Sequence, residues 1–120
     1  MTPRTPGVSQ LSAGDLKGRL DRGEAVVLLD VREDHERDHC AISTPPNAID
    51  LHIPMGQVPA RLQELRAEVG SSPLVVYCHL GMRSMTVASW LVKRGLHDVH
   101  NLEGGIDAWS VAVDPDVPRY

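Results

Sequence analysis

Short blocks of apolar residues, separated by polar ones, run along the chain and predict strands and helices in turn. The run at 25–30 is apolar almost throughout, as expected of a strand that is buried on both faces of a parallel sheet. Three further short segments, at 48–51, 74–77 and 99–102, also predict strands, and residues 8–10 form a possible edge strand.

Helices are predicted between these segments, where apolar residues recur every three or four positions. Ser12 is suited to the N-cap of the first helix, which Gly23 ends. Later helices are predicted at 58–69, at 84–94 and from Gly104 onward. The charged stretch 33–38 predicts a short helix or turn, with most of its charges in solvent.

Strands and helices alternate, their connections are short and no internal repeat is visible. This order predicts an α/β fold class, with a mainly parallel sheet of about five strands and helices on both faces. At 120 residues, of which 42% are hydrophobic and 23% charged, the chain suits one globular domain. We expect that domain at 8–120, after a loose N-terminal segment at 1–7.

Charge and hydropathy argue against nucleic-acid and membrane partners. The net charge is −4 and no run of Lys or Arg is present, so a phosphate backbone finds no basic surface. No apolar stretch approaches the roughly 20 residues that a membrane-spanning helix needs. The chain has 2 cysteines, too few for a disulfide scaffold, and we expect a cytoplasmic location where thiols stay reduced.

The segment Cys78-His79-Leu80-Gly81-Met82-Arg83-Ser84 is the strongest candidate for chemistry. Cys78 ends a predicted strand, Gly81 allows a tight turn, and a predicted helix follows. The first amides of a helix lack partners and carry the positive end of its dipole, so a thiolate inside such a loop is stabilised. Arg83 adds a cation beside it. We therefore expect Cys78 to be a nucleophile.

Two cysteine chemistries fit such a loop: phosphoryl transfer, and sulfur transfer through a persulfide. Cysteine phosphatases have one more residue between their cysteine and arginine than the four that separate Cys78 from Arg83. The shorter loop suits a single sulfur better than a tetrahedral phosphate, and no general acid is evident in it. Sulfur transfer therefore ranks first. A buried, inert Cys78 is the plainer alternative, and the glycine turn, the arginine and the helix start argue against it.

Three segments of the chain carry a family resemblance. They are Asp30-Val31-Arg32-Glu33, the loop Cys78-x-x-Gly81-x-Arg83-Ser84, and Gly104-Gly105-Ile106-Asp107-Ala108-Trp109. In order and spacing they resemble a single rhodanese (sulfurtransferase) domain, over about residues 8–120. The resemblance implies that Cys78 carries sulfur as a persulfide. It also implies a cradle for that sulfur, made by the amides of His79, Leu80, Gly81, Met82, Arg83 and Ser84.

The resemblance further implies a ping-pong cycle. A donor such as thiosulfate charges Cys78, and a thiophilic acceptor such as cyanide or a thiol discharges it, with no cofactor and no metal. Many family members carry Gly-His-Ile-Pro-Gly-Ala after the Asp-Val-Arg helix, where this chain has Asp38-His39-Cys40-Ala41-Ile42 and then 43–47. This variant and the tail Asp114-Pro115-x-x-Pro118-x-Tyr120 are similar to rhodanese domains fused to ubiquitin-activating-type adenylyltransferases. That likeness suggests a sulfur-carrier protein as acceptor.

Asp30 and Arg32 follow the strand at 25–30, so we expect them at the same sheet edge as Cys78. Asp30 is expected to pair with Arg83 and to support the loop, because a charge at the end of a buried strand needs a partner. Two roles stay open for Arg32. It either binds the sulfonate of the donor, which makes it a substrate-binding candidate, or it is structural.

Cys40 and His79 are less clearly assigned by the sequence. Cys40 has no helix start beside it, so packing is expected rather than redox chemistry. His79 is expected to be exposed, where it either tunes the thiolate or is simply solvated. Adjacent His and Cys residues without ligand spacing do not predict a metal site. Two functions remain as rivals: a phosphatase or arsenate reductase on the same fold, and a non-catalytic protein-binding module, against which the intact Cys78 argues.

Overall fold

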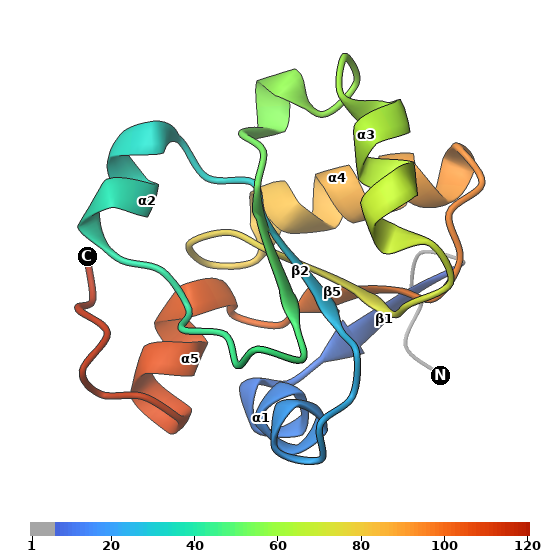
Figure 1. The fold of residues 1–120 in the computed structure, drawn as a ribbon. Coiled ribbons are helices and arrows are strands. Elements are labelled where there is room, and N and C mark those ends of the chain that lie inside the picture. Colours follow the sequence, from blue (N-terminus) through green and yellow to red (C-terminus); the bar gives the residue numbers. More distant parts are fainter. Residues whose placement is uncertain (1–6) are drawn as a thin grey trace, which may run out of the picture.

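Five parallel strands form the sheet of the computed structural model, which describes residues 7–120. The strands are β1 (Val8–Leu11), β2 (Val27–Asp30), β3 (Ile49–His52), β4 (Leu74–Tyr77) and β5 (Val99–Leu102). Their order across the sheet is β1-β5-β4-β2-β3, which places β4 at the centre (Figure 1). The predicted α/β class is confirmed, and every strand pair is parallel. The predicted loose segment at 1–7 lies, except for Gly7, outside the described residues.

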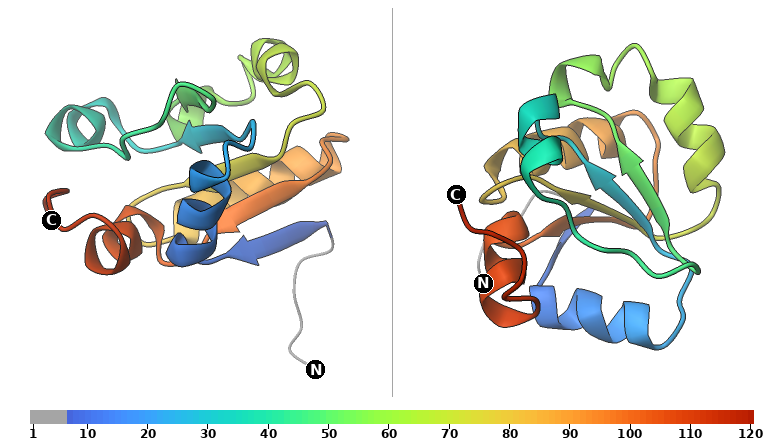
Figure 2. Two further views of the ribbon diagram at one scale, coloured as in Figure 1. Left: turned by 60° about the horizontal axis from the view of Figure 1, so that its bottom comes forward. Right: turned by 60° about the vertical axis from the view of Figure 1, so that its left-hand side comes forward.

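Helices cover both faces of the sheet (Figure 1 and Figure 2). They are α1 (Ala13–Asp21), α2 (Asp34–His39), α3 (Leu62–Val69), α4 (Met82–Lys93) and α5 (Gly105–Ala112). Helices α1 and α5 pack on one face, and α3 and α4 on the other. Within residues 7–120 no helix is long and apolar enough to cross a membrane.

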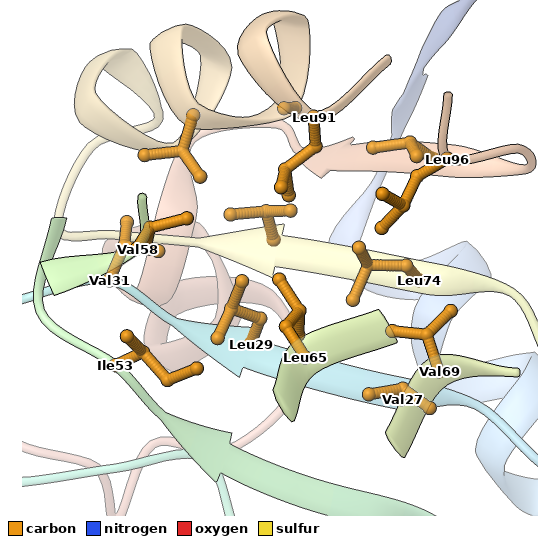
Figure 3. Close-up of a cluster of buried hydrophobic side chains, with 14 of the residues drawn as sticks. Val27, Leu29, Val31, Ile53, Val58, Leu65, Val69, Leu74, Leu91 and Leu96 are labelled. Carbon is orange, nitrogen blue, oxygen red and sulfur yellow. The ribbon is translucent and has the colours of Figure 1, made fainter. Parts of the chain in front are cut away.

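Two of the three inner strands, β2 and β4, are buried on both faces, as their apolar runs predict. On one face Leu29 belongs to the same apolar cluster as Leu65 of α3 and Leu91 of α4 (Figure 3). On the other face Leu28 belongs to a second cluster with Trp109 of α5. Each fully buried leucine side chain contributes about 1.5–3 kcal/mol. Alternate side chains of one strand thus hold the sheet between two helical layers.

Two predicted helices have different bounds in the structure. The helix expected at 58–69 begins only at Leu62, after a 3-10 turn at Met55–Gln57. Residues 58–61 form a turn instead, in which the Arg61 N–H donates to the Gln57 carbonyl at 3.1 Å. The helix expected from Ser84 begins at Met82, directly after Gly81, whose φ is 103°. Arg83 and Ser84 therefore lie in the first helical turn.

The strand register places the chemically interesting residues at one edge. Asp30 is paired with Tyr77, so the ends of β2 and β4 lie side by side, with Cys78 next in the chain. Leu102 ends β5, and the turn into α5 follows. The carboxyl ends of neighbouring parallel strands thus meet at this edge, where parallel sheets place their ligands.

Candidate active site

Cys78 lies at the start of a loop in which two backbone amides, of the six predicted to form a cradle, donate to its sulfur. Its side chain is buried, and Sγ accepts hydrogen bonds from the backbone N–H of Gly81 at 3.1 Å and of Ser84 at 3.3 Å. Both bonds exist because Gly81, with its positive φ, turns the chain back over the sulfur before α4 begins. Two amide donors at the N-terminus of a helix favour negative charge on the sulfur.

A side-chain network behind the loop connects it to the sheet. The Ser84 hydroxyl lies 3.2 Å from the Cys78 sulfur and donates a hydrogen bond of 2.6 Å to Oδ1 of Asn101. The amide group of Asn101 donates in turn to the Gly81 carbonyl and to Gln10. Asn101 was not predicted as a site residue. Its one sequence signal is a polar side chain in a strand that is otherwise expected to be buried.

The start of α5 supports the loop from the other side. The backbone N–H of Ile106 donates to the Cys78 carbonyl at 2.9 Å, and that of Asp107 donates to the His79 carbonyl at 3.1 Å. These bonds satisfy helix-end amides that have no partner within α5. Gly105 has φ 61°, and a Cβ there would lie 2.5 Å from the Cys78 carbonyl oxygen and also overlap the His79 carbonyl. Only glycine fits where the two loops meet.

Arg83 forms a two-fold ion pair with Glu36 of α2. Its Nη1 and Nη2 lie 2.6 and 2.9 Å from the two carboxylate oxygens, and the Glu36 side chain is only 10% exposed. The hydrogen bonds from Arg83 hold the pKa of Glu36 at about 2, well below its ordinary value. Most of the charged residues at 33–38 are exposed, as predicted, and Glu36 is the buried exception. The expected partner of Arg83 was Asp30, and this pairing is wrong.

Asp30 instead pairs with Arg32, and both side chains are completely buried. Arg32 donates to the two Asp30 oxygens at 2.9 and 2.8 Å, and its other N–H groups meet the Cys40 carbonyl and the Tyr120 hydroxyl. Arg37 adds a second, longer contact to Asp30. Burial lowers the pKa of Arg32, but the bonds to Asp30 and Tyr120 outweigh it and raise that pKa.

This geometry corrects the substrate-binding role predicted for Arg32. A guanidinium that is buried and saturated with protein acceptors has no donor left for a sulfonate. Its structural alternative fits the contacts: Arg32 ties the end of β2 to the segment around Cys40. Cys40 itself is half-buried and free, with its sulfur 3.8 Å from Arg32 and 3.7 Å from the Pro118 carbonyl.

Tyr120 joins the site from the C-terminal tail, which lies beside α2 (Figure 1). Its hydroxyl accepts from Arg32 at 3.0 Å and donates to Glu36 at 2.7 Å, and its ring stacks on His79 with centroids 3.9 Å apart. Burial raises the pKa of Tyr120 to about 12. His79 was expected to be exposed, and it is half-buried because this ring covers it. The sequence of the tail indicates a family likeness, but it does not predict that Tyr120 contacts the residues around Cys78.

The entrance to the loop is apolar. Leu80 and Met82 are 58% and 80% exposed, far more than other large apolar side chains of the sheet edge. They border a groove of about 410 Å³. Its remaining lining comes from α4 and from the β1 and β5 ends, namely Gln10, Gly81, Met85, Thr86, Asn101, Glu103 and Gly104.

A buried cysteine in an amide-lined loop, at the carboxyl edge of a parallel sheet, defines a class of thiol-dependent group-transfer domains. Comparison with known proteins narrows this class. Residues 12–112 match the rhodanese-like domain family, so the chain belongs to that family. The resemblance noted in the sequence is confirmed.

The relatives support sulfur transfer at the level of the family. The chain is 35% identical to the putative sulfurtransferase YtwF of Bacillus subtilis over 108 residues, which cover 90% of this chain and 96% of the relative. It is 34% identical to a sulfurtransferase of Allochromatium vinosum, with 86% and 89% covered. It is also 33% identical to the maize adenylyltransferase and sulfurtransferase MOCS3-2, of which it spans 24%.

Solved structures agree on the fold. A rhodanese-like domain protein from Staphylococcus aureus superimposes with a TM-score of 0.72 at 28% identity, covering 93% of this chain and 98% of the other. A rhodanese-related protein from Thermoplasma volcanium gives a TM-score of 0.72 at 27% identity, covering 93% and 99%. Both likenesses extend over nearly the whole of each chain.

Proposed function

We propose that the protein transfers sulfane sulfur through a persulfide on Cys78. One observation carries this proposal: two backbone amides converge on the Cys78 sulfur from a loop with only four residues between Cys78 and Arg83. A loop this short suits a single transferred sulfur better than a tetrahedral phosphate. The membership of the family and the names of its relatives support the same chemistry.

The proposed cycle has two balanced steps. The Cys78 thiolate attacks the outer sulfur of a donor such as thiosulfate, the donor bond to that sulfur breaks, and the leaving group departs with the bonding electron pair. The persulfide keeps the charge of the attacking thiolate, and the loop amides stabilise it. A thiolate or cyanide then attacks the outer sulfur, and Cys78 leaves as the regenerated thiolate. Each step uses only donor, acceptor and protein.

The remaining site residues have supporting roles in this proposal. His79, Leu80, Gly81, Met82, Arg83 and Ser84 form the loop around the transferred sulfur. Asp30 supports the loop indirectly, because it holds Arg32, which binds the Tyr120 hydroxyl beside Glu36. The likeness to the maize protein, whose name joins adenylyltransferase and sulfurtransferase, favours a sulfur-carrier protein as acceptor, and a low-molecular-weight thiol is the alternative.

The proposal is tested by intact-mass spectrometry after incubation with two sulfur donors, thiosulfate and benzenethiosulfonate. We expect wild type to gain about 32 Da, the mass of one sulfur atom, and to lose it when cyanide is added. Cys78→Ser should gain nothing, while Cys40→Ser, which removes the other cysteine, should behave like wild type.

Failure of both donors to add mass to reduced Cys78 would refute the proposal. Turnover of an aryl phosphate that disappears in Cys78→Ser would establish the phosphatase rival instead. Cys78→Ser with unchanged loading would place the sulfur on another group.

A further inference from the structure

The arginines around the loop are already neutralised by carboxylates of the same chain. Arg83 pairs with Glu36 at 2.6 Å, and Arg32 pairs with Asp30 at 2.8 Å. The groove beside the loop has a single ionisable lining residue among those described, Glu103, and its charge is negative. Among residues 7–120, a doubly negative donor therefore meets no unpaired arginine beside the loop or in this groove.

Glu36 is fixed in place by more than Arg83. Its Oε1 accepts from the backbone N–H of Glu33 at 3.1 Å, and its Oε2 accepts from the Tyr120 hydroxyl at 2.7 Å. If Arg83 turned toward a donor, it would leave a nearly buried carboxylate without its cation, which is strongly unfavourable. Glu36 thus keeps the Arg83 guanidinium in an internal ion pair.

The exposed side chains at the entrance are of the opposite character. Leu80 and Met82 stand in solvent on either side of Gly81, and Met85 continues this apolar surface along the groove. Gly81, which lies between Leu80 and Met82, donates its N–H to the Cys78 sulfur at 3.1 Å, so a donor bound at this sulfur lies close to both side chains. An apolar leaving group gains from burying surface against them, and a small dianion does not.

We propose that Glu36 is a specificity-determining residue that selects donors with an apolar leaving group of low charge over thiosulfate. Glu36 acts through Arg83, whose charge it withholds from the donor. The inference rests on the proposed function, since it concerns the donor that loads Cys78. It assigns to the site a donor class that includes thiosulfonates and the persulfides of uncharged thiols.

Two probes that deliver the same sulfur atom test this inference. Thiosulfate releases sulfite, a dianion, and benzenethiosulfonate releases benzenesulfinate, an apolar monoanion. In both reactions the Cys78 thiolate attacks the outer sulfur, the sulfur–sulfur bond of the donor breaks, and charge is conserved. The measured quantity is kcat/KM for each donor, with cyanide as acceptor.

Wild type should prefer benzenethiosulfonate, and Glu36→Gln should raise kcat/KM for thiosulfate at least about fivefold. Benzenethiosulfonate should gain only about twofold, because Coulomb energy scales with the charge of the donor. Asp38→Asn is the matched control, since it removes an exposed charge from the same helix without contacting Arg83. It should leave the ratio of the two donors unchanged.

The double variant Glu36→Gln/Arg83→Met replaces the ion pair with a neutral pair and stays informative if the single variant fails to fold. Its ratio of the two donors should equal that of wild type, because the pair contributes no net charge. A selective loss of thiosulfate use, about tenfold, would show that Arg83 binds thiosulfate despite Glu36 and would overturn the inference. So would an unchanged ratio in folded Glu36→Gln.

Sulfur transfer through Cys78 and donor selection by Glu36 are refuted by different results. Benzenethiosulfonate could place one sulfur on wild-type Cys78 while Glu36→Gln leaves the ratio of the two donors unchanged, or while the double variant selectively loses thiosulfate use. Sulfur transfer would then stand, and the role of Glu36 would be refuted. If neither donor loads Cys78, the proposed function itself falls.

Discussion

Gly105 allows the start of α5 to pack closely against the Cys78 loop, because it has no side chain. The position that a Cβ would occupy at Gly105 faces the carbonyl groups of Cys78 and His79, and the neighbouring amides of α5 donate to the same two carbonyls. The sequence predicts Gly104 and Gly105 as a helix start. It does not reveal their packing against the nucleophile loop, because that contact joins segments that are distant in the chain.

Gly105→Ala should therefore lower both stability and activity. Alanine at φ 61° is strained, and its Cβ overlaps two carbonyl oxygens, so we expect a loss of roughly 2 kcal/mol or more in the free energy of unfolding. Sulfur loading of Cys78 should slow at least about tenfold, because displaced loop carbonyls carry the amides away from the sulfur. Urea unfolding and timed intact-mass spectrometry measure the two effects.

Gly14→Ala is the matched control for this substitution. Gly14 lies inside α1, and a Cβ there meets nothing within 4 Å. We expect this variant to gain about 0.5–1 kcal/mol and to load sulfur like wild type. Unimpaired loading in Gly105→Ala would contradict the proposed contact between the loops.

Elements of secondary structure were predicted well where burial is uniform and poorly where it depends on a distant partner. The runs that form β2 and β4 are apolar because both faces are covered, so their composition alone identifies them. Helix α2 is different. Its charged sequence predicts that most of its charges lie in solvent and does not single out Glu36, which is buried by Arg83 and Tyr120, 47 and 84 positions later in the chain. No local pattern contains that information.

The tail after α5 is an element whose attachment can be tested. Ser110 is buried and its hydroxyl donates a hydrogen bond of 2.6 Å to the Val117 carbonyl, upstream of Tyr120. Ser110→Ala leaves this carbonyl without its partner and should cost about 1 kcal/mol of stability. Amide hydrogen exchange at Val117, Arg119 and Tyr120 should become faster, because the tail is held less firmly.

Ser89→Ala controls for the helix propensity of alanine. Ser89 lies in α4, and the structure assigns its hydroxyl no hydrogen bond within the described residues. Its replacement should raise stability by a few tenths of a kcal/mol, roughly, and leave exchange in the tail unchanged. Equal exchange rates in the tail of wild type and Ser110→Ala would show that the hydroxyl does not anchor it.

At the scale of the whole molecule, the ion pair between α2 and α4 makes stability depend on pH. The pKa of Glu36 falls from 4.5 to about 2 on folding, chiefly through its hydrogen bonds to Arg83. A carboxylate whose pKa is lowered in the folded state contributes stability above its unfolded pKa, and this contribution disappears as pH falls through the folded value. The relevant interval is therefore about pH 5 to pH 2.

We expect wild type to exceed Glu36→Gln in free energy of unfolding by roughly 1–3 kcal/mol at neutral pH. The difference should shrink as the pH is lowered from about 5 toward 2, because protonated Glu36 loses its advantage over glutamine. Urea titrations at a series of pH values measure this difference, with Asp38→Asn for comparison. A gap that stays constant down to acid pH would contradict the lowered pKa.

The order of residues in the chain has a consequence for synthesis. Cys78 leaves the ribosome before Asn101, Gly105 and Tyr120, because chains are made and begin to fold from the N-terminus. Until those residues emerge, the loop that encloses the sulfur in the finished protein lacks the contacts that they make with it. The newly made thiol therefore first meets its surroundings as part of an unfolded segment, and an oxidant present at that moment reaches it without passing the groove.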